Sequence, residues 1–191
     1  MSARKGVLVF WVLAVLAALV VLWLWCSRPR PDYARGARQN AQLRSIEAAL
    51  GIFTRESGGL PPSDAVDEAD QPYCGAMKLC EALMGQDLRG FDPNSRFRLD
   101  GCDGPGGTPL YTADTLNARK GPFLTEEIAN AHKLVDIYGR GRTGPFPEHV
   151  LVLCDIYERP RETGIKAGMP VLYYRANTSL TAHDVNDPNN P

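Results

Sequence analysis

The chain has 191 residues, of which 44% are hydrophobic and 23% charged, and its formal net charge is −1. A charge this close to zero leaves no overall basic footprint, so we expect no nucleic-acid partner. Beyond Ser27 the length suits one ordinary domain, large enough to bury a core without a structural metal.

The first feature along the chain is an apolar run from Val7 to Trp25, without one polar or charged side chain. As a helix rising about 1.5 Å per residue, this run spans roughly 28 Å, close to the ~30 Å hydrocarbon core of a membrane. It predicts a transmembrane helix over residues 7–26, after a cytoplasmic N-terminus of residues 1–6. The alternatives are a buried core helix and a cleaved secretory signal. Cleavage needs small side chains, whereas the run ends in WLWCS.

Two prolines, Pro29 and Pro31, predict a linker over residues 27–32. A second helix is expected from about Tyr33 to Ser57, because apolar residues recur along it at steps of three and four. These residues form a packing stripe that should face a core: Leu43, Ile46, Leu50 and Phe53. The globular domain is expected over residues 33–180, followed by a polar tail over residues 181–191.

The remaining elements are shorter. Helical spacing predicts a helix from Cys74 to Met84 and a turn or short helix from Leu124 to Ala131. The clearest strands come late, at His149–Tyr157 and Pro170–Arg175, because both are dense in β-branched and aromatic residues. A hairpin loop from Glu158 to Gly168 would join them. The expected fold is α+β, with the long amphipathic helix packed on a small antiparallel sheet.

Four of the five cysteines lie in the expected globular domain, namely Cys74, Cys80, Cys102 and Cys154. An even number without a CxxC pair favours disulfides and an oxidising compartment, with Cys74–Cys80 and Cys102–Cys154 as one of three possible pairings. Four buried free thiols in the cytosol are the alternative. Arginines are more numerous after the apolar run than before it, which favours a cytoplasmic domain. We follow the cysteines and expect the domain on the exoplasmic side.

Three segments then follow one another: ARQNAQLRSIEAALGIFTRESGGLPPS after the apolar run, KGPFL at Lys120–Leu124, and PVLYYRAN at Pro170–Asn177. In this order they resemble the type IV pilin-like family, and in particular the major pseudopilin of bacterial type II secretion. The resemblance implies a pilin-like fold and a single-pass anchor in the inner membrane, with the domain on the periplasmic side. It also implies a structural role in protein transport, with other pilin-like subunits or secretion-machinery proteins as partners.

The resemblance places a processing site at Gly6 and Val7. In the family a phenylalanine follows this glycine and a glutamate lies five residues past it, whereas here Val7 and Trp11 occupy these positions. A chain that is not processed would be a permanently anchored envelope binding module that does not assemble into filaments. This is the alternative function.

No pattern of catalytic residues is apparent, so we predict a protein without enzymatic activity and without a cofactor. His132, His149 and His183 are far apart and lack a metal-ligand spacing, although His132 and Asp136 would share one helix face. A membrane-tethered hydrolase is the third hypothesis, and a pocket joining His132 or His149 to carboxylates would favour it. Calcium has two candidate groups, neither with EF-hand spacing: Asp64, Asp67, Glu68 and Asp70 in a loop, and Asp184, Asn186, Asp187 and Asn189 in the tail.

Overall fold

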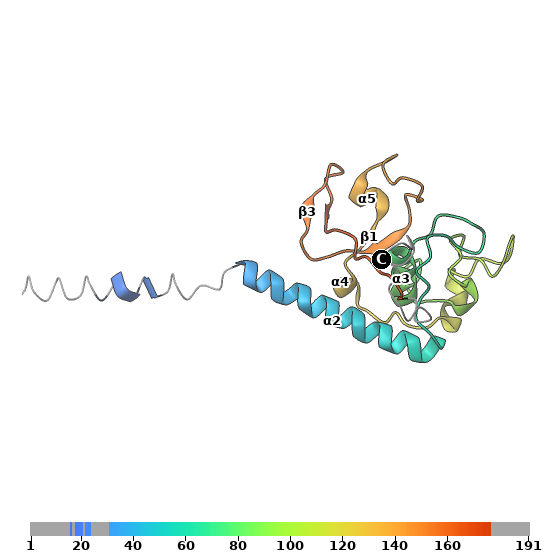
Figure 1. Cartoon of the computed structure of the whole chain (residues 1–191), viewed down its shortest axis with the longest axis horizontal. Helices are drawn as coiled ribbons and strands as arrows, with labels where there is room; N and C mark the ends of the chain where they lie inside the picture. Colours follow the sequence, from blue (N-terminus) through green and yellow to red (C-terminus); the bar gives the residue numbers. More distant parts are fainter. Residues whose placement is uncertain (1–15, 17, 21, 24–30, 177–191) are drawn as a thin grey trace, which may run out of the picture. The chain divides into compact units, whose positions relative to one another are not determined.

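The computed structural model describes residues 16, 18–20, 22–23 and 31–176 (Figure 1). The chain divides into two units, Met1–Ala37 and Arg38–Pro191. The second unit mixes helices with two small antiparallel sheets, so the predicted α+β class is confirmed. The elements in chain order are α2 (Pro31–Ser57), α3 (Gly75–Met84), the 3₁₀ helices η1 (Pro93–Ser95) and η2 (Ala113–Ala118), α4 (Glu126–Ala129), β1 (Ala131–Lys133), α5 (Leu134–Tyr138), β2 (Leu151–Leu153), β3 (Arg159–Pro160) and β4 (Lys166–Ala167).

Most of the predicted transmembrane run lies outside the described residues. The six described residues of the run are helical, and Leu16 and Trp23 among them are 52% and 68% exposed. Within the described part of the chain, no helix is long and apolar enough to cross a membrane. The transmembrane helix is therefore not supported by the structure and stays a prediction. The processing site at Gly6 and Val7 and the tail over residues 181–191 also lie outside the described residues.

The second predicted helix is present as α2, which begins two residues earlier than expected and ends at Ser57. Its buried face in the second unit repeats at steps of four, three and four, which keeps the residues on one side of a helix. This face consists of Gln42, Ile46, Ala49 and Phe53. The predicted packing stripe is right at three of its four residues: Ile46 and Phe53 are buried, and the half-buried Leu50 packs against the same core. Leu43, in contrast, is 45% exposed.

Helix α3 lies at the centre of the second unit, and all ten of its residues are buried. Its bounds differ from the predicted helix Cys74–Met84 by one residue, so that prediction is confirmed. Helix α3 contacts β2 directly. Helix α2 reaches the sheet through a shared apolar cluster, in which its Ile46, Ala49 and Phe53 join Leu83 of α3 and Leu153 of β2.

The sheets are smaller than the sequence predicts. Strand β2 is the centre of the predicted strand His149–Tyr157, and it pairs antiparallel with β1, with Ala131 opposite Leu153. The predicted turn or short helix Leu124–Ala131 is present as the shorter α4. Strand β1 was not expected, because its first residue was assigned to that helix. Strands β3 and β4 form a second antiparallel pair within the predicted hairpin loop Glu158–Gly168.

The predicted strand Pro170–Arg175 is not one of the strands β1 to β4, but the segment runs beside β2. Pro170 forms an isolated bridge with Cys154, and the Val171 amide donates to the Leu153 carbonyl at 2.8 Å. Its side chains alternate as in a strand: Val171 and Tyr173 pack against the core, whereas Leu172 and Tyr174 are 71% and 78% exposed. Successive side chains of a strand point to opposite faces, so Tyr173 and Tyr174 lie as the predicted strand requires.

Candidate functional site

An apolar groove of about 580 Å³ runs along α2. One wall is α2 itself, with Leu43 and Leu50, and the opposite wall is the segment Val171–Tyr173. The predicted stripe of α2 is therefore divided: Phe53 lies in the core and Leu43 lines the groove, whereas Ile46 and Leu50 contact both. Because Leu43 and Leu172 are 45% and 71% exposed, the groove presents apolar surface to its surroundings.

Two of the three segments on which the resemblance rests line this groove, and contacts of Tyr173 hold the wall opposite α2. The Tyr173 hydroxyl donates to the Pro61 carbonyl at 2.9 Å. The Tyr173 carbonyl oxygen lies so close to α3 that a Cβ at Gly75 would approach it to 2.3 Å. Glycine at position 75 therefore permits the segment to lie directly against the start of α3.

The third segment, KGPFL, packs nearby. The Phe123 amide donates to the Leu83 carbonyl at 2.8 Å, and the Phe123 ring meets Phe53 edge-on at 6.1 Å. Leu124 is buried in the same cluster. The three segments that carry the resemblance thus meet around the second half of α2, although they are far apart in the sequence.

Two glutamines attach α2 to α4 and to the segment after β2. Gln42 Nε2 donates to the carbonyls of Ile128 and Cys154, each at 2.8 Å, and Gln39 Oε1 accepts from the Ile156 amide at 3.1 Å. Gln42 Oε1 is buried without a hydrogen-bond partner in the described part of the chain. The predicted packing stripe does not include Gln42. The 42–46–49–53 spacing was the available signal, but a glutamine in it does not indicate burial.

A buried polar network lies on the other side of α3. Glu81 is 1% exposed and accepts three hydrogen bonds from hydroxyl groups: from Tyr73 at 2.5 Å, Tyr111 at 2.7 Å and Ser95 at 2.8 Å. Burial raises the pKa of Glu81 above its ordinary value, although the hydrogen bonds act in the opposite direction. Burial also raises the pKa of Tyr73 and of Tyr111.

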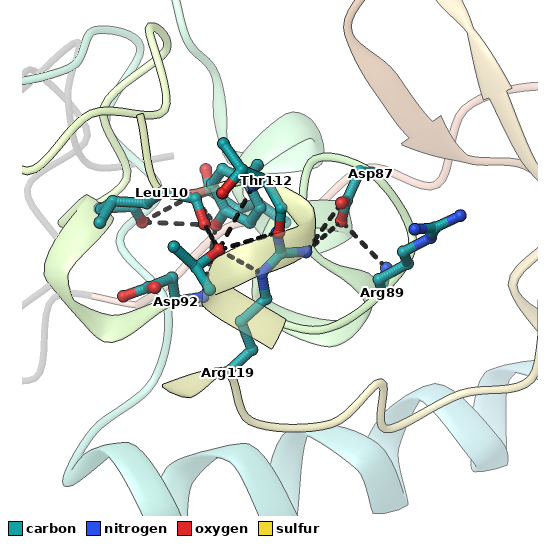
Figure 2. A network of polar contacts seen from close by, with 10 residues as sticks. Asp87, Arg89, Asp92, Leu110, Thr112 and Arg119 are labelled. Carbon is teal, nitrogen blue, oxygen red and sulfur yellow. Dashed lines mark hydrogen bonds and ion pairs between the residues drawn. The ribbon is translucent and has the colours of Figure 1, made fainter. Parts of the chain in front are cut away.

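The network continues through Tyr111 to Arg119, whose guanidinium lies 5.0 Å from the centre of the Tyr111 ring. Figure 2 shows Arg119 between Thr112 and Asp87. Arg119 Nη1 lies 2.7 Å from each carboxylate oxygen of Asp87, and Nη2 donates to the Thr112 carbonyl at 2.7 Å. These contacts join the loop after α3 to both ends of η2, so this arginine has a structural role. No sequence pattern indicated either Glu81 or Arg119.

The structure brings His149 and Glu81 to one cavity, which is the combination that the hydrolase hypothesis requires. The cavity measures about 70 Å³, whereas sites for small-molecule substrates measure roughly 300–1,000 Å³. Both Glu81 oxygens already accept hydrogen bonds, so the geometry favours a structural network at this position. The predicted pairing of His132 with Asp136 on one helix is wrong: His132 lies in β1, where it contacts Asn130 Oδ1 at 3.1 Å, and Asp136 lies in α5.

All four described cysteines are free thiols. Cys74 precedes α3 and Cys80 lies six residues further along it, which separates their Cα atoms by about 9 Å, beyond the reach of a disulfide. Burial raises the pKa of Cys154 to about 12, which disfavours the reactive thiolate. The structure thus gives no support to the predicted disulfides.

The acidic loop is held by hydrogen bonds rather than arranged around an ion. The buried ammonium of Lys78 lies 2.7 Å from an Asp64 oxygen and donates to the Val66 carbonyl at 2.6 Å. Asp67 accepts from backbone amides, among them that of Leu99 at 3.0 Å. No group of histidine, cysteine or carboxylate side chains in the described residues could hold a metal ion. The calcium candidates of the tail lie outside these residues.

Comparison with protein-family models, with curated proteins and with solved structures finds no match. Any inference about function therefore starts from the residues and their geometry. Among the sites above, the Glu81 network is closed and internally satisfied, whereas the groove along α2 is open and apolar. The groove is the better candidate for a functional surface.

Proposed function

We propose that this chain is a non-enzymatic, membrane-anchored, pseudopilin-like structural subunit of a type II secretion or type IV pilus-like assembly. Its apolar N-terminal helix would anchor it in the inner membrane, with the globular domain on the periplasmic side. The groove along α2 would receive other pilin-like subunits or proteins of the secretion machinery.

The apolar groove along α2 is the observation that carries this proposal. A helix that serves only its own domain needs one apolar stripe, which here is the buried face with Ile46 and Phe53. Helix α2 has further apolar side chains, Leu43 and Leu50, which line the groove together with the exposed Leu172. Covering such a surface with a partner removes apolar area from water, which favours association.

Exposed apolar side chains before α2 support the anchor. Leu16, Leu19, Val20, Leu22 and Trp23 are each more than half exposed, and a helical stretch with such side chains is stabilised by lipid or by neighbouring helices. Extraction of native membranes with alkaline carbonate tests this part separately. The chain is expected in the pellet, and its release into the supernatant would contradict the anchor.

Site-specific photo-crosslinking in native membranes tests the assembly. The photoreactive residue p-benzoylphenylalanine replaces Leu43 in the groove or, as a matched control, Tyr138, which is 41% exposed on α5 and outside the groove. We expect adducts with a second copy or another pilin-like subunit from position 43 and none from position 138. Adducts from neither position, in a chain that fractionates with the membrane, would contradict the proposal.

The alternative is the permanently anchored binding module, which Val7 and Trp11 favour because they depart from the processing signature. Intact-mass and N-terminal analysis of the membrane protein separates the two functions. A chain that begins at Val7 with a methylated amine supports the assembling subunit. A chain that begins at Met1 or Ser2 supports the module.

A further inference from the structure

A second pocket, of about 340 Å³, lies at the C-terminal end of α2. Its walls come from the last turn of α2, the following residues Gly58–Leu60, the loop around η1 and Lys120. Only Leu60 is shared with the groove. A volume of this size lies at the lower end of the range for small-molecule sites, roughly 300–1,000 Å³.

Three phenylalanines form the apolar wall. Phe97 stacks on Phe91 with ring centres 4.9 Å apart and planes 26° apart, and Phe53 meets Phe91 edge-on at 5.2 Å. Phe53 and Phe91 are 2% and 3% exposed, so they form the floor. Phe97 is half-buried and therefore presents aromatic surface to the pocket.

The backbone beside this wall is strained. Arg96 and Phe97 have φ values of 47° and 58°, a left-handed conformation that residues other than glycine rarely adopt. Such strain persists where the surroundings hold it, and it is common at ligand clamps. Here Arg96 and Phe97, both left-handed, turn the chain directly after η1. The turn places the Phe97 ring on Phe91, and both Arg96 and Phe97 line the pocket.

The charged groups of the pocket are unequal. Arg96 is exposed and its guanidinium makes no hydrogen bond or ion pair within the part of the chain that the structure describes. Lys120 Nζ, in contrast, already donates to the Glu56 carbonyl, which belongs to the last turn of α2. The pocket therefore has one cation without a partner, which is Arg96. The Glu56 carboxylate and the last carbonyls of α2 repel anions. A ligand with one negative charge can pair with Arg96, whereas a second negative charge would be repelled by Glu56.

We propose that this pocket binds a single carboxylate attached to an aromatic side chain, which is the chemistry of a peptide C-terminus that ends in an aromatic residue. Arg96 pairs with the carboxylate through its guanidinium fork, and the aromatic side chain packs on Phe97. Apart from Leu60, this site shares no lining residue with the groove, and it does not rest on the assembly proposed above.

Ligand-observed saturation-transfer NMR on the full chain in detergent micelles tests the proposal, with N-acetyl-phenylalanine as the probe. N-acetyl-phenylalanine amide lacks the carboxylate and N-acetyl-alanine lacks the ring. We expect saturable binding of the probe. Each analogue should bind with an affinity at least about fivefold lower, since each loses one of the two interactions. Absence of saturable binding, or equal binding of the acid and the amide, would overturn the proposal.

Two variants assign the binding to the pocket. Arg96→Gln removes the unpaired cation and should weaken the acid about fivefold while leaving the amide unchanged. Arg89→Gln makes the same charge change at an exposed arginine outside the pocket and should change neither. Leu60→Ala removes an exposed part of the wall and should weaken acid and amide alike. If Arg96→Gln and Arg89→Gln behave identically, the guanidinium does not recognise the ligand and the assignment fails.

Discussion

Replacement of Glu81 tests how the buried network stabilises the second unit. In Glu81→Leu, the hydroxyls of Tyr73, Ser95 and Tyr111 lose the acceptor that each contacts at 2.5 to 2.8 Å. A buried donor without a partner costs about 1–3 kcal/mol. Removal of the buried carboxylate returns part of this cost, so we expect a net loss of about 3–6 kcal/mol. A typical domain has a stability of about 5–15 kcal/mol, so this loss would be a large share.

Glu81→Gln separates the hydrogen bonds from the ionisation. The amide keeps one acceptor oxygen, and the hydroxyls can rotate to accept from its nitrogen, so we expect a loss of about 1–2 kcal/mol near pH 5. Because the fold raises the pKa of Glu81 above 4.5, the folded state keeps this proton to a higher pH than the unfolded state does. The stability that Glu81 contributes is therefore complete below about pH 4.5 and declines as the pH rises through the raised pKa. Glutamine does not titrate, so its penalty relative to wild type should shrink with rising pH, by at most about 1.4 kcal/mol per unit.

Urea unfolding of a fragment that starts at Pro31 measures both effects. All three tryptophans, Trp11, Trp23 and Trp25, precede this fragment, so the near-UV circular dichroism of its tyrosines reports tertiary structure. Wild type and the two variants are compared at several values between pH 4.5 and 8. The reasoning is refuted if Glu81→Leu stays within about 1 kcal/mol of wild type, or if the penalty of Glu81→Gln grows as the pH rises.

Two further pairs of variants use the same unfolding measurement. Gln42→Glu turns a carboxylate toward two backbone carbonyls and should lower the stability by about 3 kcal/mol or more. Gln39→Glu keeps the acceptor oxygen that Gln39 supplies and should change the stability by less than about 0.5 kcal/mol. Equal losses would contradict the assigned donor and acceptor roles. Gly75→Ala forces a methyl to 2.3 Å from the Tyr173 carbonyl and should cost about 1–3 kcal/mol. Gly51→Ala has open space around it in the middle of α2 and should gain about 0.5–1 kcal/mol. A tolerated Gly75→Ala would show that the segment at Tyr173 does not lie against α3.

Among the predicted elements, the helices agree best with the structure, because they were predicted from periodicity. The apolar spacing placed α2 and α3 within two residues of their observed bounds, because the 3.6-residue period is a local property of the chain. The α+β class and the alternation of Tyr173 and Tyr174 follow from equally local patterns. Local periodicity did not predict the rotation of α2 about its axis, that is, which of its side chains face the core. Leu43 and Gln42 differ by one position, and sequence hydrophobicity favours the wrong one for burial.

Tertiary structure decided the rest, because the deciding partners lie in other segments of the folded chain. Gln42 is buried since the carbonyls of Ile128 and Cys154, 86 and 112 residues away, accept its amide protons. Glu81 is buried within a helix since hydroxyls from three other segments converge on it. The same holds for β1, whose strand conformation depends on its pairing with β2. By itself the sequence determined the helices α2 and α3, the fold class and the apolar run at the N-terminus. Which polar groups could leave water depended on contacts that only the folded chain brings together.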